Sequence, residues 1–406
     1  MKEKTIQARE NGSKTLQSSI AYFTEETGIM PGLSVACGTA ERALTAHGGL
    51  ADAAKNIPLT EDAIFDLASL TKLFTGLLVM RLNADGKLDL TRPVTDYAPQ
   101  FTQLDKVSVD AVLGFEVGLT TPGRVDAAPS PEEALRLLYA IQPGEVTGRA
   151  YSDMHAMVLR YVIEGAAGEG YSQLLQKCIL GPLGMTNTYR VVPPELRHLC
   201  VSCDGEHRIE RGKYILRRTE PGFPHDPKAA RLFPDPCGHA GLFSTRGDLV
   251  KLCQGLLKGE VIPRESLLAM SRNRTGYRRE DGTYQQYLGA QCYVKHPVQR
   301  HSEVPPYMGE GAISLSGFTG HHISVDIERG LFALFLGSRC QSRLTVLLPE
   351  AGKSLTDYGL NPDGTGQVLW PDGEWVRSSV EYVYHKDAHF HRAVALALRD
   401  SVDFPL

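Results

Sequence analysis

β-strand patterns lie near both ends of this chain, and mainly helical patterns lie between them. Residues 33–37 alternate along a strand, and a polar turn and a returning strand follow, which predicts a β-hairpin. Residues 321–339 predict two further strands around a polar turn at 328–330. Between residues 66 and 280 the apolar positions mostly recur at helical spacing. The sheet must therefore be assembled from both ends of the chain, with the helical middle inserted beside it, and ligand sites tend to lie in clefts between such layers.

Helices are also predicted at the two ends of the chain. Residues 13–27 and residues 386–400 each place apolar side chains on one stripe at helical spacing. Residues 366–379 differ from both, because they resemble a small hairpin around Pro-Asp-Gly that carries both tryptophans, Trp370 and Trp375.

Charge and hydropathy exclude several classes of protein. A net charge of -4 offers no basic stripe for nucleic acid. No run of about 18 apolar residues is present, so no membrane span is expected. The polar N-terminus has no apolar segment behind it, so we see no signal peptide and expect a cytoplasmic protein. In that compartment the eight cysteines are expected to be reduced thiols. The oligomeric state stays open.

One apolar stretch, LASLTKLFTGLLVM at residues 67–80, contains a single charge, Lys72. Its leucines and phenylalanine follow helical spacing, which leaves Ser69 and Lys72 on a narrow polar stripe. The pattern alone is equally compatible with the polar edge of a surface helix. The alternative is a nucleophile with its base, because residues three apart share a helix face and the two side chains can meet.

The chemistry of such a pair is well defined. A serine hydroxyl is a poor nucleophile without an adjacent base. A lysine near its reference pKa of about 10.4 already holds its proton, but burial disfavours the charged form and lowers that pKa. We therefore expect the leucines around Lys72 to tune it as a base. Ser69–Lys72 is the one S-x-x-K match in the chain.

Several segments together resemble the serine β-lactamase-related family, which includes class C β-lactamases, low-molecular-weight penicillin-binding proteins and their esterase and peptidase relatives. PGLSVACG at 31–38 resembles the first sheet strand, and residues 65–101 resemble the nucleophile helix and the segment after it. Tyr151-Ser152-Asp153 resembles the second motif, Tyr-x-Asn, with aspartate in the third place. The resemblance implies that Ser69 is the nucleophile, that Lys72 and Tyr151 act as general base and acid, and that Asp153 contacts substrate.

The resemblance covers residues 25–345 and implies an α/β (α+β) fold of the β-lactamase/transpeptidase-like type. Such a fold has an antiparallel sheet flanked by N- and C-terminal helices and a mostly helical middle subdomain. The predicted organisation is a catalytic domain at 13–345, with a sheet part at 13–65 and 281–345, a helical part at 66–280, and an extra hairpin-like segment and C-terminal helix packing on the sheet at 346–406.

Two further segments resemble the same branches of the family. His225-Asp226-Pro227-Lys228-Ala229 is similar to an HDxxA element, and residues 238–249 are similar to a recurrent GHAGLFSTRGDL segment. We interpret both as mainly structural, with His225 and Asp226 able to line the cleft and His239 as a structural histidine.

The third motif departs from the family pattern. Relatives carry Lys-Thr-Gly or His-Thr-Gly on a strand beside the site, whereas this chain has Leu315-Ser316-Gly317, followed by Phe318. Ser316 keeps a hydroxyl and Gly317 still permits close backbone approach, but the cation that holds a substrate carboxylate is missing. His321, just downstream, can restore a donor or can be an ordinary sheet-edge histidine.

These features predict a metal-free serine hydrolase that needs no cofactor and acts through an acyl-enzyme on a small ester or amide substrate. An acyltransferase with the same acyl-enzyme is the alternative, because only the acceptor that reaches the intermediate differs. A non-catalytic binding protein of the same fold is a third possibility. The missing cation at Leu315, which in relatives binds the substrate carboxylate, points away from β-lactams and D-alanyl peptides as substrates.

Overall fold

The central sheet joins the two ends of the chain, as the sequence predicts. In this computed structural model, which describes residues 2–401, β1 (Gly32–Gly38) pairs antiparallel with both β13 (Leu331–Gly337) and β2 (Ala43–Asp52). The seven strands run in the order β10-β11-β12-β13-β1-β2-β3. The remaining members are β3 (Ile57–Pro58), β10 (Tyr293–Val294), β11 (Ala312–Gly317) and β12 (His321–Asp326).

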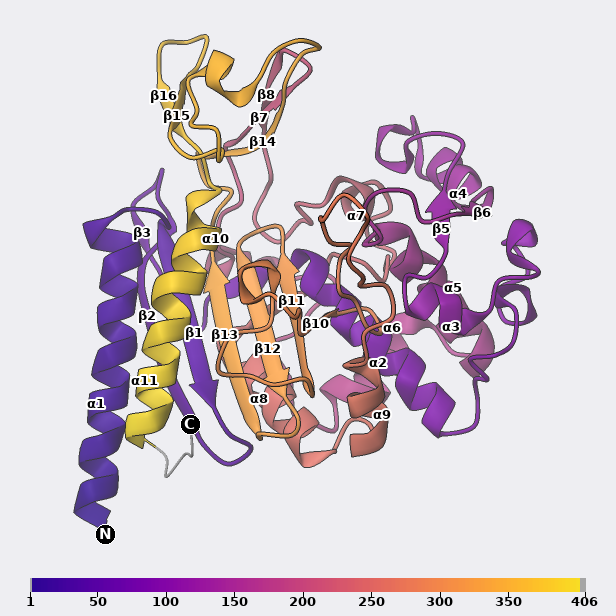
Figure 1. Ribbon diagram of the computed structural model, residues 1–406, viewed down its shortest axis with the longest axis horizontal. Coiled ribbons are helices and arrows are strands. Elements are labelled where there is room, and N and C mark those ends of the chain that lie inside the picture. Colours follow the sequence, from indigo (N-terminus) through magenta and orange to yellow (C-terminus); the bar gives the residue numbers. More distant parts are fainter. Residues whose placement is uncertain (1, 402–406) are drawn as a thin grey trace.

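Both faces of the sheet are covered, so its central strands are buried along their whole length. Alternate residues of β1 face opposite layers: Val35 packs in one apolar cluster and Ala36 in another. The Val35 side is covered by α1 (Lys2–Ala21) and α11 (His391–Ser401), which lie side by side along the sheet (Figure 1). The Ala36 side is covered by α8 (Arg246–Lys258).

The helical middle packs beside the sheet around α2 (Thr71–Ala84) and α5 (Asp153–Ala167), which contact each other. Its other helices are α3 (Val109–Leu113), α4 (Pro131–Tyr139), α6 (Tyr171–Leu175), α7 (Pro227–Arg231) and α9 (Arg264–Met270). Two short strand pairs brace it, β4 (Ile64–Asp66) with β9 (Phe243–Thr245) and β5 (Gly118–Thr120) with β6 (Gln142–Gly144). Among residues 2–401, none of the helices combines the length and the apolarity that crossing a bilayer requires.

A lobe above the sheet was not predicted from the helical pattern of residues 66–280. There β7 (Glu206–Glu210) and β8 (Lys213–Arg217) form a hairpin, and β14 (Leu344–Leu348) adds to it in parallel (Figure 1). Arg211 and Gly212 both have positive φ, +50° and +79°, as a tight hairpin turn requires. This short polar hairpin carries little apolar alternation, so its signal in the sequence is weak.

The tryptophan segment joins that lobe and does not lie on the central sheet. β15 (Gln367–Leu369) and β16 (Trp375–Arg377) pair antiparallel where the sequence predicts a hairpin. Trp370 and Val376 pack with Ile209 of β7 in a small separate core. α10 (Glu381–His385) then leads back to α11 and the sheet (Figure 1).

Candidate active site

A strained turn before α2 presents the hydroxyl group of Ser69. Residues 68–70 form a short 3-10 turn, and Ala68 has a φ of +44°, which is rare for a residue with a Cβ. The carboxylate of Asp66 accepts the Ala68 N–H at 2.9 Å. The Asp66 carbonyl in turn accepts hydrogen bonds from Thr319 Oγ1 and His321 Nε2, both at 2.7 Å. Asp66 therefore ties the turn that carries Ser69 to the adjacent sheet.

Lys72 lies one turn further along and is fully buried. Its Nζ atom donates to Ser69 Oγ at 2.9 Å, to Asp153 Oδ1 at 2.8 Å and to the His239 carbonyl at 3.3 Å. Three acceptors match the three protons of an ammonium group. The predicted contact between Ser69 and Lys72 is therefore present, and the helix-edge alternative is wrong because Lys72 faces the interior.

The expected downward shift of the Lys72 pKa is wrong. Burial does oppose the charged form, but the carboxylate of Asp153 and the nearby Tyr151 outweigh it and raise the pKa of Lys72 above its usual value. Burial likewise opposes ionisation of Asp153, yet Lys72, His239 and Lys228 hold its pKa well below the usual range. Lys72 and Asp153 therefore form an ion pair at neutral pH, in which the ammonium group is buried and the carboxylate is partly exposed to the cavity.

Tyr151 lies beside this ion pair. Its ring centroid is 4.8 Å from Lys72 Nζ, a distance at which a cation is attracted to an aromatic face. The ring stacks between Phe115 and Tyr293, with centroids 5.5 Å and 5.3 Å away. Among residues 2–401 the buried Tyr151 hydroxyl has no hydrogen-bond partner. It lies close enough to Lys72 to favour the protonated form of that lysine.

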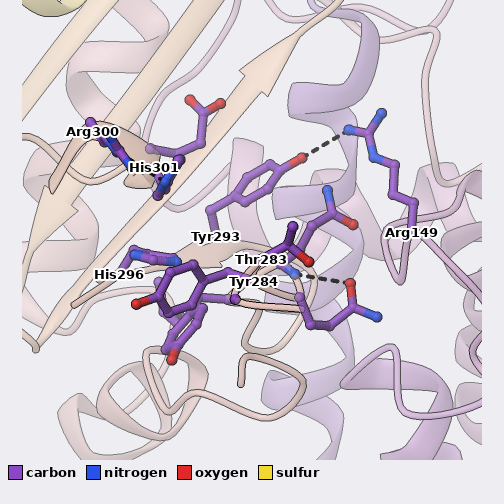
Figure 2. Close-up of a pocket in the computed structure, with 13 residues that line it drawn as sticks. Arg149, Thr283, Tyr284, Tyr293, His296, Arg300 and His301 are labelled. Atoms are coloured by element: carbon purple, nitrogen blue, oxygen red, sulfur yellow. Dashed lines mark hydrogen bonds between the residues drawn. The ribbon is translucent and has the colours of Figure 1, made fainter. Parts of the chain in front are cut away.

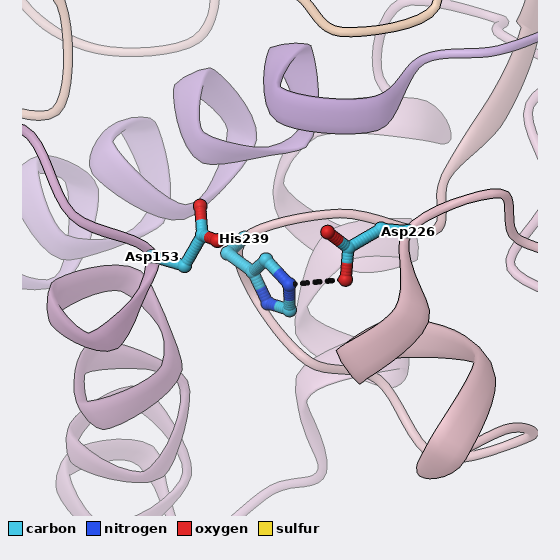
Figure 3. Close-up of side chains that lie close together, drawn as sticks. All are labelled: Asp153, Asp226 and His239. Atoms are coloured by element: carbon cyan, nitrogen blue, oxygen red, sulfur yellow. Dashed lines mark hydrogen bonds and ion pairs between the residues drawn. The ribbon is translucent and has the colours of Figure 1, made fainter. Parts of the chain in front are cut away.

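A second layer of charge surrounds Asp153. Its Oδ2 atom binds Lys228 Nζ at 3.0 Å, and His239 Nε2 lies 2.8 Å from Asp226 Oδ1 (Figure 3). Ligand atoms of Asp153, Asp226 and His239 lie within 4.8 Å of one another, close enough to share a cation. Both oxygens of Asp153 already bind ammonium groups, however, so we interpret the cluster as a charge network that holds Lys72 and Lys228.

The third motif contributes three of its predicted residues to the same cavity. Ser316 and Gly317 at the end of β11, and Phe318 after it, line the cavity with Ser69, Tyr151 and Asp153. A Cβ at Gly317 would lie 2.7 Å from the Leu67 carbonyl oxygen, so the close approach of β11 to the Ser69 turn requires glycine. The cavity has a volume of about 680 Å³.

Two predicted substrate-binding residues do not line this cavity. Side chains alternate along β11, so while Ser316 faces the cavity, Leu315 is fully buried in the apolar core behind it. His321 is also buried, and burial lowers its pKa to about 4, so its neutral ring donates to the Asp66 carbonyl. The expectations that these two side chains contact substrate are therefore wrong, and His321 instead supports the turn that carries Ser69.

A neighbouring cavity of about 580 Å³ adjoins the first. The two share Arg149, Tyr293 and Glu303 in their walls. Figure 2 shows Arg149 donating to the Tyr293 hydroxyl at 3.2 Å, with Tyr284 and His296 further along the wall. The site therefore has space on the side of Tyr151 for a second part of a substrate or for an acceptor.

A family model described as Beta-lactamase matches residues 20–345 of this chain. The chain belongs to the beta-lactamase family. The sheet, its flanking helices and the helical middle confirm the predicted beta-lactamase/transpeptidase-like fold. The family consists of serine hydrolases, which agrees with a serine and a lysine in contact at the cavity.

Relatives of the chain include enzymes of several names. A protein of Salmonella agona (strain SL483) that is named a D-alanyl-D-alanine carboxypeptidase is 26% identical over 339 residues, which are 75% of this chain and 76% of the relative. The structure of EstCE1, described as a hydrolase with promiscuous acyltransferase activity, has a TM-score of 0.63 at 20% identity and covers 81% of this chain and 94% of its own. A class C beta-lactamase from Rhodobacter sphaeroides has a TM-score of 0.59 at 19% identity, and the match covers 80% of this chain and 93% of that enzyme. These structures share the beta-lactamase fold.

Several residues of the cavity were missed from the sequence. Arg149, Glu303 and Arg339 belong to no motif that we recognised, and they come from segments far apart in the chain. Lys228 lies inside the HDxxA element, so that resemblance was the one available signal for its place beside Asp153.

The buried carboxylate of Glu206, behind the cavity, predicts acid sensitivity. Burial would raise its pKa, but His225, whose Nε2 atom lies 3.0 Å away, Thr345 and Arg208 lower it from 4.5 to about 2. The unfolded state therefore binds more protons between these values, and the free energy of unfolding falls as the pH drops from about 4.5 towards 2. By linkage Glu206 contributes about 3 kcal/mol at neutral pH.

Urea unfolding at a series of pH values checks this. We expect Glu206→Gln to be less stable than the native chain at pH 7 and to show a shallower loss of stability on acidification. Glu210→Gln, on the same strand but partly exposed, is the control and should follow the native slope. If the free energy of unfolding of Glu206→Gln and of the native chain fell equally steeply with pH, Glu206 would not be the source of the acid sensitivity.

Proposed function

We propose that this beta-lactamase family protein hydrolyses a small ester or amide through an acyl-enzyme formed on Ser69. The observation that carries the proposal is the 2.9 Å contact between Lys72 Nζ and Ser69 Oγ at the wall of a cavity. A serine so placed lies next to the groups that can take its proton, once Lys72 or Tyr151 has released one of its own.

In the proposed reaction Ser69 Oγ attacks the substrate carbonyl and its proton passes to the Lys72–Tyr151 pair. The same proton then goes to the leaving alcohol or amine, and water releases the acyl group by the reverse sequence. Lys72 is protonated at rest, so it cannot take the Ser69 proton in that state. The reactive form of the enzyme is therefore one in which either Lys72 or Tyr151 has lost a proton. The backbone N–H groups of Ser69 and Phe318 are the proposed oxyanion donors.

An acyltransferase is the second candidate, since one feature of the site favours it. The adjoining cavity shares three wall residues with the Ser69 cavity, so an alcohol or amine acceptor can be held next to the acyl-enzyme. EstCE1, with the same fold, is described as both hydrolase and acyltransferase. Product partition with and without an added alcohol distinguishes the two reactions.

A fluorophosphonate probe tests the proposal directly. Attack by Ser69 Oγ on phosphorus expels fluoride, so intact-mass measurement should give one adduct on the native chain and none on Ser69→Ala. Ser152→Ala is the matched control: Ser152 lines the same cavity but caps α5, and this variant should keep the adduct. An unlabelled native chain, or an adduct that survives Ser69→Ala, would refute Ser69 as the nucleophile.

A further inference from the structure

The hydroxyl group of Ser316 is held by a carboxylate and an imidazole at the edge of the Ser69 cavity. Ser316 Oγ donates to Glu303 Oε2 at 2.9 Å. His322 Nδ1 lies 3.1 Å from Ser316 Oγ. His322 reaches it because Ser316 and His322 are directly opposite in the β11–β12 register. Glu303 lines the cavity with Ser316, so an acidic side chain lies beside the third motif.

The direction of each hydrogen bond follows from the groups present. An ionised carboxylate only accepts, so the single Ser316 proton points to Glu303. Burial lowers the pKa of His322 well below its usual value, and Lys386 and His391 lower it further, so the ring is neutral. Its one proton must then lie on Nδ1 and point to Ser316, while Nε2 accepts from Ser324 Oγ at 2.7 Å.

Ser316 therefore has no proton left to offer the cavity. Its remaining lone pair and the oxygens of Glu303 are acceptors, so this edge of the site accepts hydrogen bonds and donates none from these two side chains. A substrate carboxylate placed here would meet lone pairs and negative charge, whereas an N–H group would meet two acceptors.

The local charge has the same sign. Behind Glu303 lies the buried Lys386, with its Nζ 4.0 Å from Glu303 Oε2 and 2.5 Å from Asp387 Oδ1. The one ammonium group is shared between two carboxylates and lies closer to Asp387, so it offsets the charge of Glu303 only in part. Lys386 thus stabilises Glu303 without cancelling the charge that the cavity meets.

Most cations elsewhere in the cavity wall have acidic partners. Arg208 and Arg217 pair with Glu206, and Lys228 pairs with Asp153. Two guanidinium groups differ: within residues 2–401, Arg149 and Arg339 have no carboxylate at ion-pair distance. Arg149 donates to the Tyr293 hydroxyl, and Arg339 lies 4.6 Å from the centre of the Phe318 ring. These two guanidinium groups are the places in the cavity wall where an anionic substrate group could bind instead.

We propose that Ser316 and Glu303 select a substrate that presents a hydrogen-bond donor, in its strongest form an ammonium group, to this edge of the cavity. The inference rests on the proposed acyl-enzyme function and names its substrate class: esters or amides with an amine in place of the carboxylate of the penicillin-type substrates. A charge-assisted hydrogen bond to Glu303 accounts for the preference.

Two matched series of esters test the preference. Within each series the substrates differ in one end group, ammonium, methyl or carboxylate, placed on the acyl chain in one series and on the leaving alcohol in the other. In at least one series we expect kcat/KM to be about tenfold higher for the ammonium ester than for the carboxylate ester. Glu303→Gln should bring the ratio close to one, and Glu303→Lys should reverse it. Glu310→Gln removes one acid outside the cavity and should leave the ratio unchanged.

Labelling by the neutral fluorophosphonate separates the two levels of the proposal. If Ser69 is labelled in the native chain and in the Glu303 variants, but in neither series does the native enzyme prefer the ammonium ester over both the methyl ester and the carboxylate ester, the inference is overturned while the proposed function stands. A carboxylate preference that Arg339→Gln removes would assign the substrate contact to that guanidinium and overturn it as well. If the native chain is never labelled, the proposed function itself fails.

Discussion

Replacing Ser69 with alanine, or Lys72 with methionine, should each lower the turnover of a small ester by a factor on the order of 10⁴. Ser69 is the proposed nucleophile, and Lys72 is the group in direct contact with its oxygen, at 2.9 Å. Groups that act as one unit lose most of their effect when either is removed. The double variant should therefore be no slower than the slower of the two single variants.

Steady-state kinetics of the native chain and the three variants provides the measurement. Thr75→Val is the matched control on the same helix, since Thr75 is buried and bonds to Tyr171 and to the Gly238 carbonyl, away from Ser69. It should change stability far more than turnover per folded molecule. Independent, multiplicative effects of the Ser69 and Lys72 substitutions would contradict a coupled pair.

Replacing Asp153 with alanine should lower the free energy of unfolding by about 3 kcal/mol. The change removes the carboxylate 2.8 Å from a fully buried ammonium group and leaves Lys72 with two uncharged acceptors, Ser69 Oγ and the His239 carbonyl. An uncompensated buried charge is more costly than the loss of the pair itself. Lys72 should respond with a lower pKa, because burial then acts with no carboxylate beside it.

Chemical denaturation checks the size of this effect. The exposed pair Arg136–Glu133 on α4 offers the contrast, and Glu133→Ala should cost less than about 1 kcal/mol. The double variant Lys72→Met/Asp153→Leu removes both charges and should recover much of the stability that Asp153→Ala loses. If Asp153→Ala costs no more than Glu133→Ala, Lys72 is not held as a buried cation.

Much of the site was predictable because its signals are local. Ser69 and Lys72 lie three apart where a 3-10 turn leads into α2, so the spacing within one short segment was enough to predict their contact. Tyr151 and Asp153 were found through a short motif, and helix α5 begins at Asp153. The hairpin at residues 32–49 and the two strands within residues 321–339 were predicted for the same reason, since alternation within each strand is a local property.

The errors concern interactions between segments that are far apart in the chain. Leu315 was expected at the cavity, but which side of β11 faces the cavity depends on how that strand packs against α2 and the Ser69 turn. The charge of Lys72 was expected to be lost on burial, but Asp153, 81 residues away, keeps it. The lobe built from β7, β8 and β14 joins residues more than a hundred positions apart, and its polar strands carry little periodic signal.

By itself the sequence determined the family's fold and singled out Ser69 and Lys72 as the candidate nucleophile and its partner, because helix spacing, strand alternation and short motifs are local and survive without knowledge of the packing. Only the tertiary structure decided the charge of that lysine, the burial of Leu315 and the acceptor character of the cavity edge at Ser316 and Glu303. These properties depend on partners that folding brings together, since burial and nearby charges, which set protonation and hydrogen-bond direction, are not written in any one segment.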